Sequence, residues 1–164
     1  MLLQDIINTA KYSELNGLAV ANQTETIVSF INLGLIELYK EFALHTEEHI
    51  ISLQDNVTIY DLPADFMYLV AAYGEVPKGS DRLSNILPVN VEDDVFSINT
   101  ISYNQVQVPL AFTGEYVSLI YVRKPVMLTL NDLGEEVDIP DQLLTPLLNF
   151  VALNATKLSR GVSN

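Results

Sequence analysis

The sequence predicts an α+β fold: a small helical bundle formed by the N- and C-terminal helices, with an antiparallel β insert between them. Three observations predict this fold. Apolar residues recur with helical spacing at both ends of the 164-residue chain, short alternating apolar runs fill its middle, and turn residues separate those runs. Helices and strands that are segregated along a chain are typical of α+β proteins. A chain of this length buries enough surface to form one domain.

Two helices are expected before the strands. Residues 2–11 place leucine and isoleucine at helical spacing, and a break that contains Asn16-Gly17 follows. Residues 25–42 form the clearest helical pattern of the chain, with Asn22 or Thr24 as the expected N-cap. Glycine in a helix interior costs about 1 kcal/mol relative to alanine. We therefore expect Gly34 to mark a close approach to another helix.

The middle of the chain, residues 48–125, is expected to be rich in strands. A hairpin is expected over residues 49–60, with a turn at Gln54-Asp55-Asn56. Further strands are expected at residues 66–76, 95–101, 105–108 and 116–123, of which the last alternates most clearly. Residues 77–81 have the composition of a loop, and residues 87–91 are ambiguous around Pro88.

The C-terminal region, residues 139–160, is expected to be helical again. Pro146 leaves two alternatives open: a separate turn over residues 141–144 with a helix restarting at Thr145-Pro146, or one helix that begins with a kink. Small residues on its apolar stripe permit a close approach of backbones. We therefore expect Ala152 or Ala155 to pack against Gly34 of the second helix.

The charge balance excludes several classes of function. Eight Lys and Arg residues face 21 Asp and Glu residues, which gives a net charge of −13. Binding of nucleic acid through its phosphates requires a basic surface, so this class is not expected. The chain has no Cys, which excludes disulfides and cysteine zinc sites. The start has no basic segment and no apolar run reaches 18 residues, so neither a signal peptide nor a membrane span is expected.

One motif has the form of a metal site. His45-Thr46-Glu47-Glu48-His49 matches the H-x-x-E-H pattern of inverted zinc proteases, which requires both histidines on one helix face. The motif falls where the second predicted helix has ended and a strand begins, so we expect a polar link, with no metal, no cofactor and no enzymatic activity. Two alternatives stay open: a small metal-dependent hydrolase using His45, Glu48 and His49, or an acidic protein-binding adaptor.

Acidic clusters occur at Glu92-Asp93-Asp94 and at residues 135–138. Neither has the spacing of a calcium loop, and we expect solvated surfaces. No Lys or Arg lies between Arg82 and Arg123, so sequence neighbours cannot neutralise the first cluster. Because buried unpaired charges are costly, these carboxylates must be solvated or paired with another subunit.

Four motifs in order resemble the head-to-tail connector (adaptor) proteins of short-tailed bacteriophages, the tail tubular protein A-like group. The motifs are Leu38-Tyr39-Lys40-Glu41-Phe42, Tyr60-Asp61-Leu62-Pro63-Ala64-Asp65-Phe66, Tyr121-Val122-Arg123-Lys124-Pro125, and Val137-Asp138-Ile139-Pro140 before a helix with Phe150-Val151-Ala152-Leu153-Asn154-Ala155. The residues that carry the resemblance are Tyr39, Phe42, Tyr60, Leu62, Pro63, Phe66, Tyr121, Arg123, Pro125, Pro140 and Phe150. Two departures are that Phe150 stands where tyrosine is expected, and that the chain stops at Asn164, where some of these proteins continue into a tail that docks into the portal.

The resemblance implies a single connector domain over residues 1–164, with a helical part (1–44 and 139–160) and a β-rich part (48–125). It implies a structural protein of the virion neck or tail, assembled in the host cytoplasm, without a membrane. About twelve copies would form a homo-oligomeric ring, with the portal protein above and a tail or nozzle protein below. DNA would pass through the ring without sequence-specific binding. In that setting we expect Glu92, Asp93 and Asp94 to face the channel or its rim.

Overall fold

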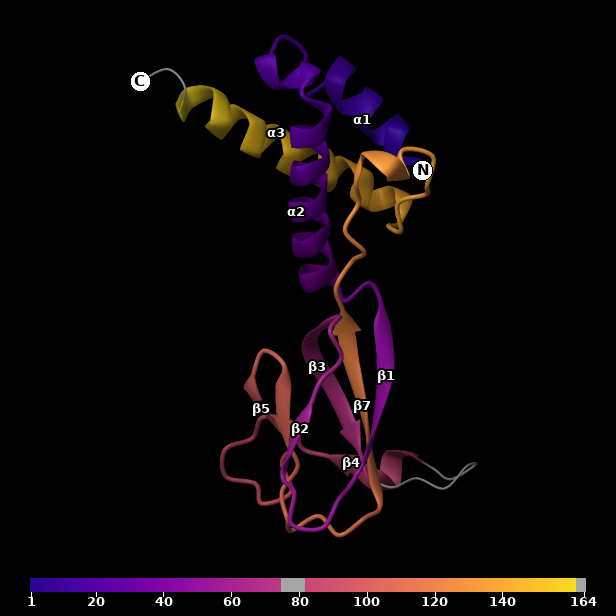
Figure 1. Ribbon diagram of the computed structural model, residues 1–164, viewed down its shortest axis with the longest axis vertical. Coiled ribbons are helices and arrows are strands. Elements are labelled where there is room, and N and C mark those ends of the chain that lie inside the picture. Colours follow the sequence, from indigo (N-terminus) through magenta and orange to yellow (C-terminus); the bar gives the residue numbers. More distant parts are fainter. Residues whose placement is uncertain (75–81, 162–164) are drawn as a thin grey trace. The chain divides into compact units, whose positions relative to one another are not determined.

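The computed structural model describes residues 1–74 and 82–161 and confirms the α+β class (Figure 1). Three α-helices come from the two ends of the chain: α1 (Leu3–Tyr12), α2 (Thr24–Phe42) and α3 (Leu144–Gly161). The strands between them are β1 (Thr46–Ser52), β2 (Ile59–Asp61), β3 (Phe66–Tyr73), β4 (Ile86–Leu87), β5 (Asn99–Ser102), β6 (Gln105–Gln107) and β7 (Tyr116–Arg123). Short 3-10 turns are η1 (Ala19–Asn22), η2 (Arg82–Asn85), η3 (Leu130–Asp132) and η4 (Asp141–Leu143).

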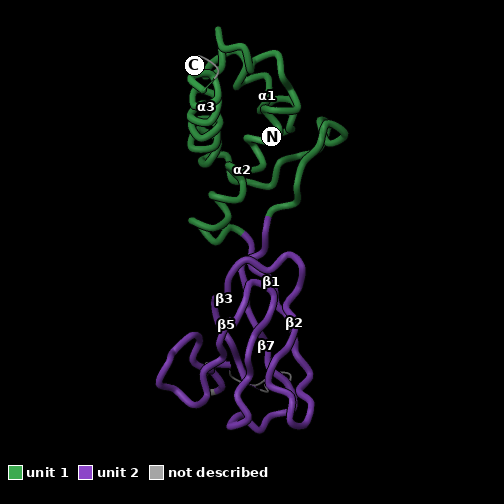
Figure 2. Tube along the Cα trace, turned by 60° about the vertical axis from the view of Figure 1, so that its left-hand side comes forward, with its two compact units in different colours: residues 1–44, 125–164 green, residues 45–124 purple. Residues whose placement is uncertain are grey.

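The chain divides into two compact units (Figure 2). Residues 1–44 and 125–164 form the helical unit, and residues 45–124 form the β unit. The segment between residues 126 and 138, which the sequence-based division assigned to neither part, belongs to the helical unit.

The helical unit is built around one core of leucine, isoleucine and valine from all three helices. These residues repeat at intervals of three and four, which places them on one face of each helix. The N-terminus is tied to the segment before η4, because Leu3 N donates to Glu135 O at 3.0 Å and Val137 N donates to Met1 O at 3.0 Å. Val137 is buried in the same core.

The start of α2 differs from the expectation. Its N-cap is Gln23, which makes no side-chain cap hydrogen bond, instead of Asn22 or Thr24. Asn22 is the last residue of η1, and the hydroxyl of Thr24 accepts a hydrogen bond from Lys11 Nζ at 3.0 Å. Asn22 therefore lies before the cap position, inside η1, and Thr24 lies after it as the first residue of α2.

The start of α3 is close to the first of the two alternatives. A separate 3-10 turn, η4, precedes the helix, and α3 begins at Leu144. Pro146 is therefore the third residue of α3. Proline is tolerated in the first turn of a helix, where backbone N–H groups have no partner within the helix.

Two antiparallel sheets form the β unit, with strand orders β1-β7-β3-β4 and β2-β6-β5. β1 pairs with β7 without interruption, from Thr46 opposite Val122 to Ser52 opposite Tyr116, whereas β3 contains two irregularities against β7. One core of aliphatic and aromatic residues from both sheets fills this unit.

Several strand predictions are wrong in detail. Residues 49–60 do not form a hairpin, because β1 pairs with β7 and β2 pairs with β6 in the other sheet. β5 begins at Asn99 instead of residue 95, since residues 91–96 form an exposed turn. β3 ends at Tyr73, and its expected continuation over residues 75–76 lies outside the described residues, as does the expected loop at 77–81.

Candidate functional site

Two of the motifs meet at one end of the β unit. The rings of Phe66 and Tyr121 lie 5.5 Å apart between centroids, and the Tyr121 hydroxyl donates to Asp65 Oδ1 at 2.9 Å. The backbone N–H of Lys124 donates to the carbonyl oxygen of Asp65 at 2.7 Å. The Y-x-L-P-x-D-F segment and the Tyr121–Pro125 segment therefore form one cluster, which we call the β clamp: Asp65, Phe66, Tyr121, Arg123 and Lys124.

Burial raises the pKa of Tyr121 to about 12, and the hydrogen bond and negative charge of Asp65 act in the same direction. The hydroxyl therefore stays protonated at neutral pH and keeps its role as donor to the carboxylate. Arg123 Nε lies 3.6 Å from Glu47 Oε1, and its backbone N–H donates to His45 O at 3.0 Å. These contacts hold together the two points at which the chain enters and leaves the β unit, and Pro125 follows directly.

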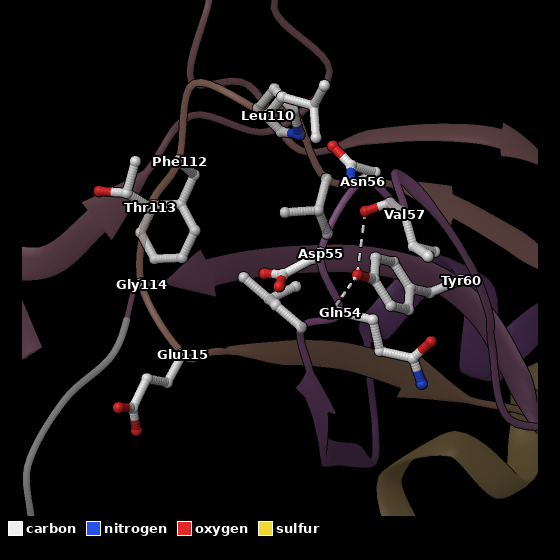
Figure 3. Close-up of a pocket in the computed structure, with 13 residues that line it drawn as sticks. Gln54, Asp55, Asn56, Val57, Tyr60, Leu110, Phe112, Thr113, Gly114 and Glu115 are labelled. Carbon is white, nitrogen blue, oxygen red and sulfur yellow. Dashed lines mark hydrogen bonds between the residues drawn. The ribbon is translucent and has the colours of Figure 1, made fainter.

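The first residues of the Y-x-L-P-x-D-F segment support a loop. The Tyr60 hydroxyl donates to Val57 O at 3.0 Å and accepts from Gln54 N at 2.9 Å. Leu62 is buried and its N–H donates to Asn104 O at 2.8 Å, and the half-buried Pro63 follows it. A pocket of about 440 Å³ lies beside Tyr60, between the loop after β1 and the loop before β7 (Figure 3).

The lining of this pocket includes two carboxylates, Asp55 and Glu115. Within the described ranges, no buried side-chain nitrogen or oxygen atom lacks a hydrogen-bond partner, and no group of three potential metal-ligating side chains occurs. The pocket lies between two loops, one of which is held by the hydrogen bonds of Tyr60.

The other two motifs meet in the helical unit. The hydroxyl of Tyr39 on α2 donates to the carbonyl oxygen of Asp138 at 2.8 Å, and Val137 beside it is buried in the core. Pro140 is the N-cap of η4. Phe42 at the end of α2 is 53% exposed and takes no part in this contact.

Gly34 lies against α3. A Cβ atom added at Gly34 would come within 2.6 Å of Leu147 Cδ1 and 3.1 Å of Phe150 Cδ1. The nearest atoms thus belong to Leu147 and Phe150, not to the alanines expected from the sequence. Ala155 is buried in the helical core and Ala152 is half-buried on α3.

The H-x-x-E-H motif does not lie on a helix. His45 precedes β1, and Glu48 and His49 are neighbours within that strand. The strand therefore begins earlier than expected, and most of the motif belongs to the strand instead of to a link between helix and strand. Successive side chains of a strand point to opposite faces, which directs Glu48 and His49 apart. The geometry needed for a zinc site of this type is therefore missing.

Glu48 has a structural role that the sequence did not reveal. Its Oε1 accepts from Ser118 Oγ at 2.7 Å and from Arg82 Nη2 at 2.9 Å, and Arg82 lies 4.8 Å from the centre of the Tyr73 ring. The partners come from β1, β7, β3 and η2. In the sequence, the only indication of this contact was that Ser118 falls at a buried position of the alternating strand β7. Local sequence does not show that Glu48 and Arg82 are the partners of Ser118.

The acidic cluster lies in the turn between β4 and β5. Glu92, Asp93 and Asp94 belong to a run of seven exposed residues, 90–96. Asp94 Oδ1 accepts from Phe96 N at 2.9 Å, which orders the turn. Ion pairs described for this chain do not include these three carboxylates.

A protein-family model described as SU10 adaptor protein matches residues 1–160. The chain belongs to the SU10 adaptor protein family. This confirms the identification as a phage head-to-tail adaptor, while the narrower likeness to the tail tubular protein A-like group stays a prediction. No curated protein sequence matches the chain.

Membership in the SU10 adaptor family supports a structural role in the virion over a role as an enzyme, with other head and tail proteins as partners. Among the described residues of this SU10 adaptor, no helix is both long and apolar enough to cross a membrane. Its motif residues are mainly internal: in each unit they join segments that are distant in sequence.

Proposed function

We propose that this chain forms a ring of about twelve copies that joins the phage portal to the tail and continues the DNA channel. The observation that carries this proposal is the match to the SU10 adaptor family over residues 1–160. The described geometry fits a structural role, since the motif residues join segments that are distant in sequence within each of the two compact units.

The charge of the chain fits passage of DNA. A wall that bound phosphate would retain DNA, whereas an acidic or neutral wall lets it slide. Glu92, Asp93 and Asp94 are exposed and belong to no described ion pair. We therefore place this acidic turn at the channel or its rim, where it acts by repulsion.

Electron microscopy of the chain mixed with its cognate portal protein tests the proposal directly. We expect rings seated on the portal, with rotational symmetry and an open central channel. The chain alone and the portal alone are the controls. The proposed function is wrong if the mixture contains only portals without bound chain and monomeric chain, at concentrations at which the neck of the virion stays assembled.

Neutralising the acidic turn is expected to ease assembly at low salt. Like charges repel over about 30 Å at 0.01 M salt but only about 8 Å at 0.15 M. The variant with Glu92→Gln, Asp93→Asn and Asp94→Asn should therefore form rings more readily than the unmodified chain at 0.01 M, with a smaller difference at 0.15 M. Light scattering at both salt concentrations measures this.

The same change in charge at another acidic segment provides the control, namely Glu135→Gln with Glu136→Gln and Asp141→Asn, at three exposed residues. Both variants gain three units of charge, so only position differs. Loss of assembly on neutralising the acidic turn alone would identify its carboxylates as partners of cations on another subunit, and the channel placement would be wrong.

A further inference from the structure

α2 carries an exposed stripe that its own unit does not cover. Leu33 is 49% exposed, and Glu37 and Glu41 follow at intervals of four residues, both exposed. Residues four apart lie on the same side of a helix. The α2 stripe, Leu33, Glu37 and Glu41, therefore consists of one apolar residue followed by two carboxylates.

α3 carries a second exposed stripe of the opposite charge. Leu153 is 53% exposed, and Lys157 and Arg160 follow at intervals of four and three residues, both exposed. The α3 stripe, Leu153, Lys157 and Arg160, therefore consists of one apolar residue followed by two cations. α2 and α3 cross within the helical unit (Figure 1), with Gly34 and Phe150 at their contact.

The four charges of the two stripes are not paired within one chain. In the part of the chain that the structure describes, Glu37, Glu41, Lys157 and Arg160 belong to no ion pair. Lys40, which lies between the two glutamates in sequence, has an interaction of its own. Lys157 and Arg160 are two of only eight Lys and Arg residues in a chain with a net charge of −13.

We propose that the α2 stripe of one copy packs against the α3 stripe of the neighbouring copy. The two stripes carry opposite charges, so Glu37 and Glu41 of one copy come to lie near Lys157 and Arg160 of the next. The exposed leucines, Leu33 and Leu153, are then removed from water at the same contact.

The contact joins two different surfaces of the same chain, and such contacts close into a ring when the rotation between copies permits. It also offsets the mutual repulsion of acidic copies, because complementary charges are placed only where neighbours meet. This inference rests on the proposed ring and names the surfaces that build it.

Charge reversal tests the contact. The α2-reversed variant is Glu37→Lys with Glu41→Lys, and the α3-reversed variant is Lys157→Glu with Arg160→Glu. Each variant alone brings like charges together at every interface. We therefore expect association at least about tenfold weaker than that of the unmodified chain, by sedimentation at 0.15 M salt with and without the portal.

An equimolar mixture of the two variants is expected to assemble again. The basic α2 stripe of one variant meets the acidic α3 stripe of the other, and the remaining stripes match as well, so the two chains alternate. The control for the α2-reversed variant is Asp5→Lys with Glu135→Lys, which also replaces two acidic residues by lysines but lies away from both stripes, and it is expected to assemble normally. Circular dichroism verifies that all variants are folded.

The outcomes separate the inference from the proposed function. If the unmodified chain forms no ring, alone or on the portal, the proposed function fails and the contact with it. If the unmodified chain assembles and each folded reversed variant assembles equally well, only the contact between α2 and α3 is wrong. Failure of the mixture to assemble, with both variants folded, also overturns it.

Discussion

Replacing Gly34 by Leu is expected to destabilise the helical unit by about 3 kcal/mol or more. The backbone of α2 approaches α3 so closely at this position that a Cβ atom alone would lie 2.6 Å from Leu147 Cδ1. Leu147 is fully buried and Phe150 stands beside it, so the remaining atoms of a leucine have no space. Overpacking of a filled core typically costs about 1–3 kcal/mol and occasionally more.

The measurement is thermal or urea unfolding followed by the helical signal in circular dichroism. Gly134→Leu is the matched control, since nothing lies within 4 Å of a Cβ atom at Gly134. A surface change of that kind usually alters stability by less than about 0.5 kcal/mol. Equal unfolding midpoints for the two variants would show that α2 and α3 do not meet at Gly34.

Replacing Phe66 by Ala is expected to lower the free energy of unfolding of the β unit by about 3–5 kcal/mol. Phe66 is 3% exposed and its ring contacts that of Tyr121 in the β clamp. The truncation removes this aromatic contact and leaves a cavity where β3 meets β7. Tyr121 then loses the packing that holds its hydroxyl on Asp65.

Because the chain has no tryptophan, tyrosine fluorescence in urea follows the transition, and most tyrosines lie in the β unit. Val70→Ala provides the control: the side chain belongs to the same strand but is 49% exposed, at an irregularity of the pairing with β7. The prediction is wrong if both variants unfold at the same urea concentration.

Local periodicity was sufficient to predict the helices and much of the strand content. The buried apolar residues of α2 and the alternating residues of β7 each form a pattern within one element. A single stretch of sequence therefore contains all the information needed to predict that element. The α+β class followed from the order of these elements. By contrast, the predicted hairpin over residues 49–60 failed because the partner of β1 is β7, far along the chain, and strand pairing is not encoded locally.

The Gly34 contact and the roles of the motif residues were harder to predict, because they depend on residues that are distant in sequence. Small residues on α3 indicated a close approach to Gly34, but which turn of α3 meets it depends on the crossing of the helices, and the contact falls at Leu147 and Phe150. The motif residues were identified by resemblance alone. Their physical roles, such as the bond from Tyr39 to Asp138 and the bond from Tyr121 to Asp65, became visible only in the folded chain.

The insertion of the β unit between α2 and α3 has a consequence for the order of folding. About 80 residues separate the two halves of the helical unit, and closing a flexible loop of that length costs more than closing a loop of a few residues by about 2–3 kcal/mol. A β unit that folds first removes most of this cost, because the hydrogen bond from Arg123 N to His45 O brings the ends of the insert together. During synthesis, α1 and α2 leave the ribosome before their partner α3 exists. Once residue 124 has been synthesised the β unit can fold, and its closed ends then bring α3 close to α1 and α2.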